Sequence, residues 1–245
     1  MNGDGFDDVL IGAGGHDTGG SNYGASYVFF GRDFTNDARQ IGADAADVIV
    51  GTLASETLIG GQDNDRLNGA GGSDVLKGGS GDDSINGDSG ADRIEGDSGN
   101  DTLNGGDGAD RLEGGNGADT LDGDLGSDIL VGEGGSDVFL FDDTLRADNV
   151  DTIMDFGGAG APALDSIHLD HSIFTLLALS TLSSSAFESG NDLTAATTID
   201  SRIVYDTVAG DLYYDADGVG GAVAVSFATI ATDVDGLSAA DFFVD

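Results

Sequence analysis

Apolar residues recur at every ninth position through the middle of the chain. From Gly42 to Leu140 the sequence divides into eleven consecutive units of nine residues, without an insertion or deletion. Position 8 of each unit is Ile, Leu or Phe: Ile49, Leu58, Leu67, Leu76, Ile85, Ile94, Leu103, Leu112, Leu121, Leu130 and Phe139. Positions 7 and 9 are polar in most units, and this alternation predicts a very short strand with one inward side chain.

The six residues before each strand are turn formers. Position 1 is glycine in all eleven units, and glycines at positions 2 and 4 permit positive φ and close backbone approach. Two strands and two turns then make one coil of 18 residues. Odd and even units are expected to form two parallel sheets, whose position-8 side chains meet in a thin seam.

Strand patterns continue after the repeat but lose its period. Two strands are expected near the end of the stack, at 150–156 and 164–170, with Asp151, Asp155 and Asp165 beside it. Antiparallel strands joined by glycine turns are expected at 202–206, 211–217 and 222–230. The fold class is therefore all-β: a parallel β-roll, a two-sheet right-handed β-helix, followed by a β-sandwich-like C-terminal domain.

Three regions are expected from this pattern: an N-terminal hairpin or cap at 1–41, the roll at 42–140 and the C-terminal β domain at 141–245. Apolar residues at outward positions near the ends of the roll, such as Val48, Val50 and Ile129, are expected to dock the flanking segments.

Charge changes the picture. The 245 residues include 46 acidic and 8 basic side chains, for a formal net charge of −38, with no cysteine and one proline. This balance argues against binding to nucleic acid or to an anionic membrane surface. No run of eighteen apolar residues occurs, so no membrane span is expected, and the N-terminus lacks the basic and apolar regions of a secretory signal peptide. A chain this acidic is either disordered or completed by cations.

The acidic residues keep the phase of the repeat. Position 6 is Asp47, Glu56, Asp65, Asp74, Asp83, Asp92, Asp101, Asp110, Asp119, Asp128 and Asp137. Stacked coils would hold these carboxylates at about the 4.8 Å spacing of strands, where two bare charges repel by roughly 3 kcal/mol. A calcium ion between the carboxylates turns this repulsion into attraction, because calcium takes six to eight oxygen ligands in flexible geometry. Magnesium fits such a site less well.

These units resemble the RTX (repeats-in-toxin, haemolysin-type) family, whose pattern is G-G-x-G-x-D-x-U-x. The match covers about two-fifths of the chain and implies a calcium-loaded β-roll. The implied ligands are the position-6 aspartates of units i and i+2, with main-chain carbonyls from positions 1 to 4. The carboxylate ligands would be Asp65, Asp74, Asp83, Asp92, Asp101, Asp110, Asp119, Asp128 and Asp137. The glycines of the ligand turns would be Gly72, Gly78, Gly79, Gly81, Gly87, Gly90, Gly96, Gly99, Gly105, Gly106, Gly108, Gly114, Gly115, Gly117, Gly123, Gly126, Gly132 and Gly135.

Pairing of the position-6 aspartates of units i and i+2 implies seven good calcium sites or more. The first coil should bind calcium more weakly, because position 4 is Ala45, Ala54 and then Asp63, and Glu56 replaces an aspartate.

The flanks carry two further resemblances. Residues 141–245 are similar to the C-terminal region of RTX proteins and serralysin-type proteases, which ends in an uncleaved signal for type I secretion. This implies export by the type I secretion machinery of a Gram-negative bacterium. The first 35 or so residues look like one FG-GAP repeat, in which Asn2, Asp4 and Asp8 match part of a calcium loop. One such repeat cannot close a propeller, so an upstream cargo domain is expected.

The expected function is a secreted, calcium-dependent RTX module without catalysis of its own. The alternatives are an adhesin or polysaccharide-binding module, with a cell-surface glycan as partner, or the non-catalytic tail of a secreted protease, lipase or epimerase. Two G-D-S-G segments, with Ser89 and Ser98, fall in phase with the repeat and are expected to be loop residues. His168 and His171 lack a third zinc ligand, and Asp215 with Asp217 is equally consistent with one more calcium site or a hairpin turn.

Overall fold

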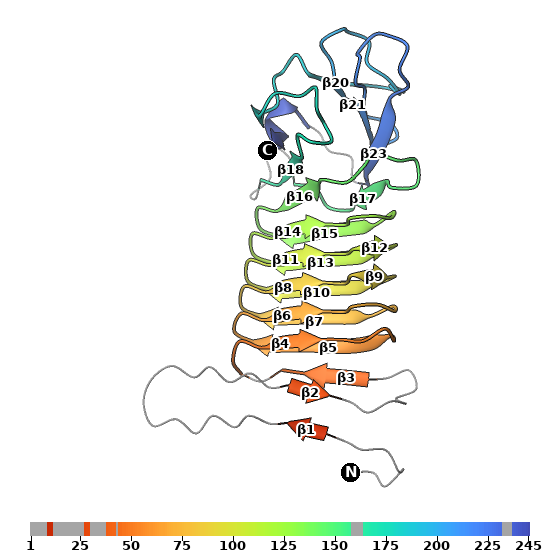
Figure 1. Ribbon diagram of the computed structural model, residues 1–245. Helices are drawn as coiled ribbons and strands as arrows, with labels where there is room; N and C mark the ends of the chain where they lie inside the picture. The colour runs from red at the N-terminus through yellow and green to blue at the C-terminus, as the bar shows by residue number, and fades with distance from the viewer. Residues whose placement is uncertain (1–8, 12–26, 30–37, 43, 158–163, 232–236) are drawn as a thin grey trace.

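Parallel coils are stacked one above another along most of the molecule (Figure 1). The computed structural model describes residues 9–11, 27–29, 38–42, 44–157, 164–231 and 237–245. Each full turn of the chain adds one strand to each of two sheets, so strands pair with partners 18 residues away, as Ile94 pairs with Leu76 and Leu112. The parallel β-roll expected from the sequence is confirmed, and no α-helix occurs among the described residues.

One sheet has eleven strands. In spatial order they are β3 (Ala38–Ile41), β5 (Glu56–Gln62), β7 (Val75–Ser80), β10 (Arg93–Ser98), β13 (Arg111–Asn116), β15 (Ile129–Gly134), β17 (Asp151–Ile153), β23 (Val225–Ile230), β22 (Asp211–Tyr214), β21 (Ile203–Asp206) and β20 (Phe187–Gly190). The other sheet has nine, in the order β4 (Val48–Val50), β6 (Arg66–Asn68), β8 (Ser84–Asn86), β11 (Thr102–Asn104), β14 (Thr120–Asp122), β16 (Val138–Phe141), β18 (Ser166–Leu169), β24 (Phe242–Val244) and β19 (Ser180–Thr181).

The remaining elements are short. Two small sheets pair β1 (Val9–Ile11) with β2 (Tyr27–Phe29) and β9 (Ser89–Gly90) with β12 (Asp107–Gly108), and one 3₁₀ turn, η1, spans Ala239–Asp241.

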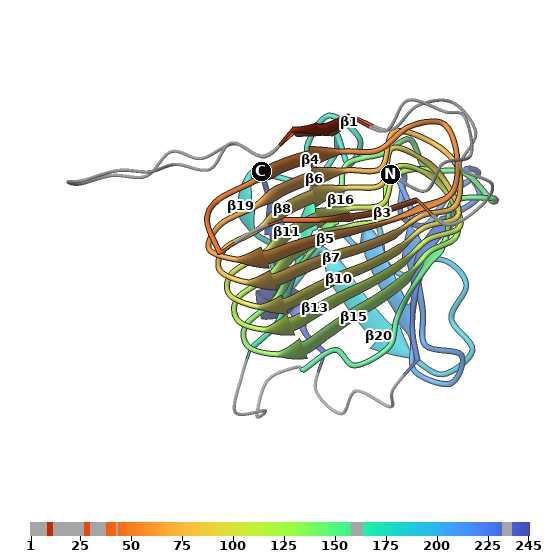
Figure 2. The same cartoon turned by 90° about the horizontal axis from the view of Figure 1, so that it is seen from below.

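The position-8 side chains form the core of the roll. Seen from below, the coils superimpose into a flattened tube, with β4, β6 and β8 on one side and β5, β7 and β10 on the other (Figure 2). All eleven position-8 residues are buried between the two sheets, and Leu58, Leu76 and Ile94 have no exposed surface. Burial of each such side chain contributes about 1.5–3 kcal/mol. One apolar residue per unit is therefore enough for a continuous seam.

The two sheets differ in a way the sequence pattern did not predict. Within the repeat, strands of the nine-stranded sheet cover positions 7 to 9, as expected. Strands of the other sheet continue into the first three positions of the next unit. β10, for example, covers positions 7 to 9 of one unit and 1 to 3 of the next. Glycine at position 1 permits this continuation, because the strand passes close to the neighbouring coil there.

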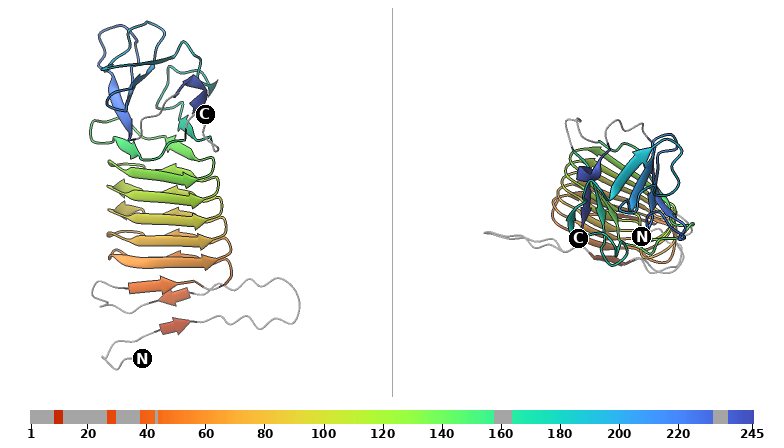
Figure 3. Two further views of the ribbon diagram at one scale, coloured as in Figure 1. Left: turned by 180° about the vertical axis from the view of Figure 1, so that it is seen from behind. Right: turned by 90° about the horizontal axis from the view of Figure 1, so that it is seen from above.

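The C-terminal strands extend the same two sheets. β17 and β18 pair in parallel with β15 and β16, and β23 and β24 pair in parallel with β17 and β18 (Figure 3). β21, β22 and β23 are antiparallel, as expected. Phe174 packs edge-on against Tyr214 and Phe227, which places an aromatic core above the aliphatic seam. Two sheets face each other here as in a sandwich, but neither sheet breaks at residue 141.

Outward apolar residues near the ends of the roll are covered to different degrees. Val48 and Val50 remain 46% and 56% exposed, and Ile129 remains 37% exposed. Most of the N-terminal segment expected to dock on Val48 and Val50 lies outside the described residues, so that docking stays a prediction. Within the described part of the chain, no helix is long and apolar enough to cross a membrane.

Candidate metal centre

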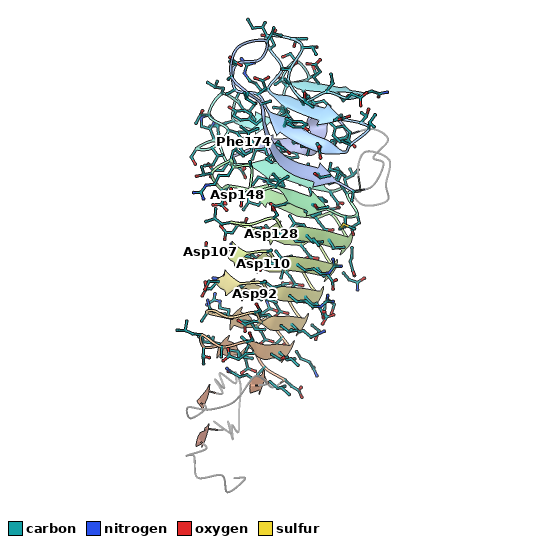
Figure 4. All side chains as sticks on the ribbon, turned by 90° about the vertical axis from the view of Figure 1, so that its right-hand side faces the viewer. Asp92, Asp107, Asp110, Asp128, Asp148 and Phe174 are labelled. Atoms are coloured by element: carbon teal, nitrogen blue, oxygen red, sulfur yellow. The ribbon has the colours of Figure 1, made fainter. Side chains whose placement is uncertain are left out.

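Stacking of the coils brings the position-6 aspartates into two columns, one along each edge of the roll. The first column holds Asp74, Asp92, Asp110 and Asp128, three of which are labelled one above another in Figure 4. The second column holds Asp65, Asp83, Asp101, Asp119 and Asp137. All nine are at most 4% exposed. The structure therefore brings together every aspartate expected as a ligand.

Each aspartate uses one carboxylate oxygen to join two coils. Asp101 Oδ1 accepts a hydrogen bond from the backbone N–H of Asp83, 18 residues earlier, at 2.8 Å, and Asp83 Oδ1 does the same for Asp65 at 2.7 Å. The bond recurs along both columns at 2.7–2.9 Å. Backbone geometry thus fixes the position and direction of every carboxylate.

In eight of the nine aspartates the second carboxylate oxygen has no hydrogen-bond partner among the described residues. Oδ2 is buried without a hydrogen bond in eight consecutive aspartates: Asp65, Asp74, Asp83, Asp92, Asp101, Asp110, Asp119 and Asp128. A buried polar atom left unsatisfied costs about 1–3 kcal/mol, and more if it is charged. Eight such atoms in two regular columns therefore indicate a cation.

Burial favours the protonated form of the position-6 carboxylates. The pKa of Asp74, Asp101 and Asp110 is raised to about 7, chiefly by burial and also by the charges of stacked neighbours, although the backbone hydrogen bond opposes this. For the same main reason the pKa of Asp65 is about 6 and that of Asp128 about 8. A cation between the coils would remove the cause of these shifts.

Position 1 is glycine because two oxygens converge on it. A Cβ at Gly96 would lie 2.4 Å from Asp101 Oδ2 and 2.5 Å from the carbonyl oxygen of Gly114 in the next coil. The same arrangement of carboxylate and main-chain oxygen recurs at Gly78, Gly87, Gly105 and Gly114. Paired carboxylate and carbonyl oxygens are the donors that calcium prefers.

Position 4 presents a second line of carbonyl groups. A Cβ at Gly117 would lie 1.6 Å from the carbonyl oxygen of Gly99 and 3.2 Å from Asp119 Oδ1. Gly90, Gly108, Gly126 and Gly135 stand in the same relation to the coil before them. The turn glycines expected at positions 1 and 4 are thus required by the approach of neighbouring coils.

The first coil departs from the pattern of the later coils. Both carboxylate oxygens of Glu56 are used within its own turn, where they accept hydrogen bonds from the backbone N–H of Thr52, at 2.7 Å, and from the Thr52 hydroxyl. The Glu56 carboxylate therefore already has hydrogen-bond donors within its own turn.

The columns continue beyond the repeat. Asp151 Oδ1 accepts from the N–H of Asp128 at 3.0 Å, and Asp165 Oδ1 accepts from the N–H of Asp137 at 3.0 Å. The spacings are 23 and 28 residues instead of 18. We expected these two acids near the end of the roll but did not name them as ligands. Each precedes an inward isoleucine by two positions, Ile153 or Ile167, as position 6 precedes position 8, and that spacing could have identified them.

The other candidate sites are occupied by ordinary contacts. The hydroxyls of Ser89 and Ser98 donate to carbonyl oxygens of the preceding coil, at 3.3 Å. His168 pairs with Asp245 at 3.0 Å and stacks on Phe243.

Asp215 and Asp217 accept backbone hydrogen bonds at 3.0–3.3 Å, as carboxylates of a hydrogen-bonded turn do. Asn2, Asp4 and Asp8 lie outside the described residues.

Without calcium, acidification should stabilise the roll. The folded-state pKa values of about 6 to 8 in Asp65, Asp74 and Asp128 exceed the usual 3.8, so the folded chain binds more protons than the unfolded chain in this interval. The stabilisation is complete below about pH 4 and is lost as pH rises through 6 to 8. Far-UV circular dichroism in calcium-depleted buffer should therefore show more β structure at pH 5.5 than at pH 8. A β content that rises with pH would contradict this.

Comparison with known families identifies the repeat. Residues 41–76, 68–103 and 104–139 match the family model of the RTX calcium-binding nonapeptide repeat (4 copies), and residues 1–29 match that of the FG-GAP repeat. No curated protein matches the chain. The resemblances expected from the sequence are confirmed for these two segments. RTX repeats are calcium-binding modules typical of type I secreted proteins.

Proposed function

With RTX calcium-binding repeats over residues 41–139 as the premise, we propose that the chain is a calcium-dependent folding module of a protein exported by a type I route. The single observation that carries this is the set of eight buried Oδ2 atoms without hydrogen-bond partners. The columns would hold about seven calcium ions or more between stacked coils. Binding free energy then becomes folding free energy.

Three basic side chains of the roll are engaged away from the aspartate columns. On the outer face of the eleven-stranded sheet, Arg93 pairs with Glu113 at 2.9 Å, Arg111 pairs with Glu113 at 2.7 Å, and Lys77 pairs with Glu95. These pairs supply no counter-charge to the inner columns. Calcium is the natural substitute, since extracellular modules bind it with dissociation constants of about 10⁻⁴–10⁻³ M.

Export and folding would then be separated by calcium concentration. In a cytosol with little calcium the acidic chain stays unfolded, as passage through a narrow export channel requires. The final strand, β24, supports this order: Phe242 and Val244 are 0% and 3% exposed, so a signal at this end would be readable only in the unfolded chain. Outside the cell, calcium would fold the roll.

The module is proposed to have no catalytic activity of its own. The carboxylates that could act as acids or bases recur identically along the roll and face neighbouring turns, an arrangement that suits metal binding. Any activity of the whole protein would then lie outside this module.

A calcium titration followed by far-UV circular dichroism tests the proposal, with magnesium as the matched control. We expect a cooperative coil-to-β transition in calcium and none at the same magnesium concentrations. A chain that is fully folded in excess chelator would overturn the proposed dependence on calcium.

A second candidate function is binding of a neutral polysaccharide. A shallow groove of about 650 Å³ runs over the nine-stranded sheet and is lined by hydroxyl and amide side chains, including Ser84, Thr102 and Asn104. Asp88, Asp107, Asp124 and Asp143 also line it. Because Arg93 and Arg111 are paired with glutamates, the outer face offers no basic stripe for an anionic polymer. A glycan array probed in calcium should show neutral chains bound if this groove is a site, and no binding would reject it.

A further inference from the structure

Asparagine followed by glycine recurs in phase with the repeat on one of the two sheets. Position 9 of the nine-stranded sheet is Asn68, Asn86 and Asn104 in three successive coils, and the next residue is glycine in each case. Asparagine is chemically labile, because its side-chain amide can be attacked by the backbone nitrogen of the next residue. Glycine, which has no side chain, hinders that attack least. Each of the three dipeptides is therefore a candidate for deamidation.

The reaction needs only water as a co-reactant. The glycine nitrogen loses its proton and bonds to the side-chain carbonyl carbon of the asparagine, and that carbon releases its amide nitrogen, with a proton, as ammonia. Water then opens the resulting succinimide ring at either of its two carbonyl carbons. The products are aspartate and isoaspartate, and both carry a new carboxylate. Isoaspartate also adds the side-chain methylene carbon to the main chain.

In the folded roll the attacking nitrogens are engaged. Each position-1 N–H donates to the carbonyl oxygen of position 9 in the next coil, at 2.8–2.9 Å, in Gly69, Gly87 and Gly105. A backbone N–H that donates between stacked coils is released only when the coils open. Folding therefore withholds the nucleophile at all three dipeptides.

The side chains under attack are held as well. Asn68 Nδ2 and Asn86 Nδ2 donate to the two carboxylate oxygens of Asp88, at 2.8 and 2.7 Å. Asn86 Oδ1 also accepts from the backbone N–H of Asp88 at 3.0 Å. Asn104 Nδ2 donates to Asp124 at 2.5 Å. These bonds fix the direction of each amide, so folding restrains both groups that must meet in the reaction.

The glycine of the labile pair cannot be replaced without disturbing the roll. A Cβ at Gly87 would lie 2.5 Å from Asp92 Oδ2 and 2.5 Å from the carbonyl oxygen of Gly105. A Cβ at Gly69 would meet Asp74 Oδ2 at 2.6 Å. Stacking thus requires glycine after position 9, and any asparagine at that position carries the liability.

We propose that Asn68, Asn86 and Asn104 are deamidation sites that react while the chain is unfolded and are protected once calcium folds it. The inference rests on the proposed function, which gives the chain an unfolded period without calcium. A chain that remains in this state accumulates carboxylates at position 9. At Asn86 the new acid would face Asp88, which would have lost an amide donor. Deamidation therefore sets a time limit on the unfolded state.

Peptide mapping by mass spectrometry tests the sites in chain incubated at pH 8 with calcium, with chelator, or with chelator and guanidinium chloride. Loss of Asn68, Asn86 and Asn104 should be at least about tenfold slower in calcium than in guanidinium chloride, because stacked coils must open first. Asn64 and Asn100 are the matched controls: each precedes aspartate instead of glycine and should react far more slowly in guanidinium chloride.

Equal rates in calcium and in guanidinium chloride at the three sites would overturn the proposal. So would reaction of the two control asparagines at the same rate as the sites in guanidinium chloride. The chelator sample, followed by circular dichroism, separates the inference from the proposed function. If the chelated chain is folded, the proposed calcium dependence fails, while the comparison of calcium with guanidinium chloride still decides the sites. Protection of the sites in a chelated chain that is unfolded would contradict the inference.

Asn86→Asp reproduces one product and tests its effect. The substitution replaces a donor to Asp88 by an acid and should raise the calcium concentration at the folding midpoint several-fold. Asn100→Asp is the matched control, because it adds the same charge and keeps the oxygen that accepts from the N–H of Ala118, at 2.8 Å. Its midpoint should stay close to that of wild type. Equal midpoints in the two variants would overturn the proposed time limit.

Discussion

Replacement of Asp101 by alanine is expected to raise the calcium concentration at the folding midpoint several-fold. Asp101 Oδ1 accepts from Asp83, and its own N–H donates to Asp119 Oδ1, so the residue belongs to two successive sites on one edge. The substitution removes a ligand from both and leaves the buried N–H of Asp83 unpaired, which alone costs about 1–3 kcal/mol. A calcium titration by far-UV circular dichroism measures the shift.

Asp107→Ala is the matched control for this variant. Asp107 lies in a neighbouring turn and carries the same charge, but its side chain is exposed (Figure 4). We expect its midpoint to stay close to that of wild type. Equal shifts in the two variants would mean that total charge, and not the pairing of position-6 aspartates, sets the calcium requirement.

Gly117→Ala is expected to be more damaging still. The new Cβ would lie 1.6 Å from the carbonyl oxygen of Gly99, at a residue whose φ is +152°. The backbone at Gly117 and the backbone at Gly99 cannot move apart, because each is fixed within its own coil. The destabilisation should exceed about 3 kcal/mol, beyond the usual range for single substitutions, and should appear in thermal unfolding at saturating calcium.

Gly134→Ala provides the comparison, since a Cβ there meets nothing closer than 3.8 Å. It should melt within a few degrees of wild type. If Gly117→Ala melted with it, coils in solution would be further apart than the structure has them, and the carbonyl column at position 4 could not serve as a source of ligands.

The repetitive part of this molecule could be predicted from its sequence because every unit meets the same surroundings. Leu76 and Leu112 are buried for the same reason, because each is the inward residue of its strand. The nine-residue period identifies both without any knowledge of the fold. Asp83 and Asp101 follow in the same way, since their phase relative to the apolar residue is constant. Because the units repeat, the place of each of these residues in the fold can be predicted from its position within its own unit.

The parts that were missed depend on contacts between coils at which the period fails. Asp151 and Asp165 take the role of position 6 after insertions that lengthen the turn, so counting in nines does not reach them. Asn68 and Asn86 look like ordinary polar residues at position 9, and only stacking shows that both hold Asp88. Differences in strand length between the two sheets likewise arise from packing.

The hydrogen bonds of the two columns all point the same way along the chain. Each coil receives its carboxylate acceptor from the coil that follows it, as Asp128 receives one from Asp151. For these bonds the stack has a polarity: removing coils from its N-terminal side leaves every remaining position-6 N–H with its carboxylate acceptor, whereas removing its C-terminal side strips one such N–H of its acceptor. Units could be gained or lost in pairs during evolution, while the segment bearing Asp151 and Asp165 would have to stay.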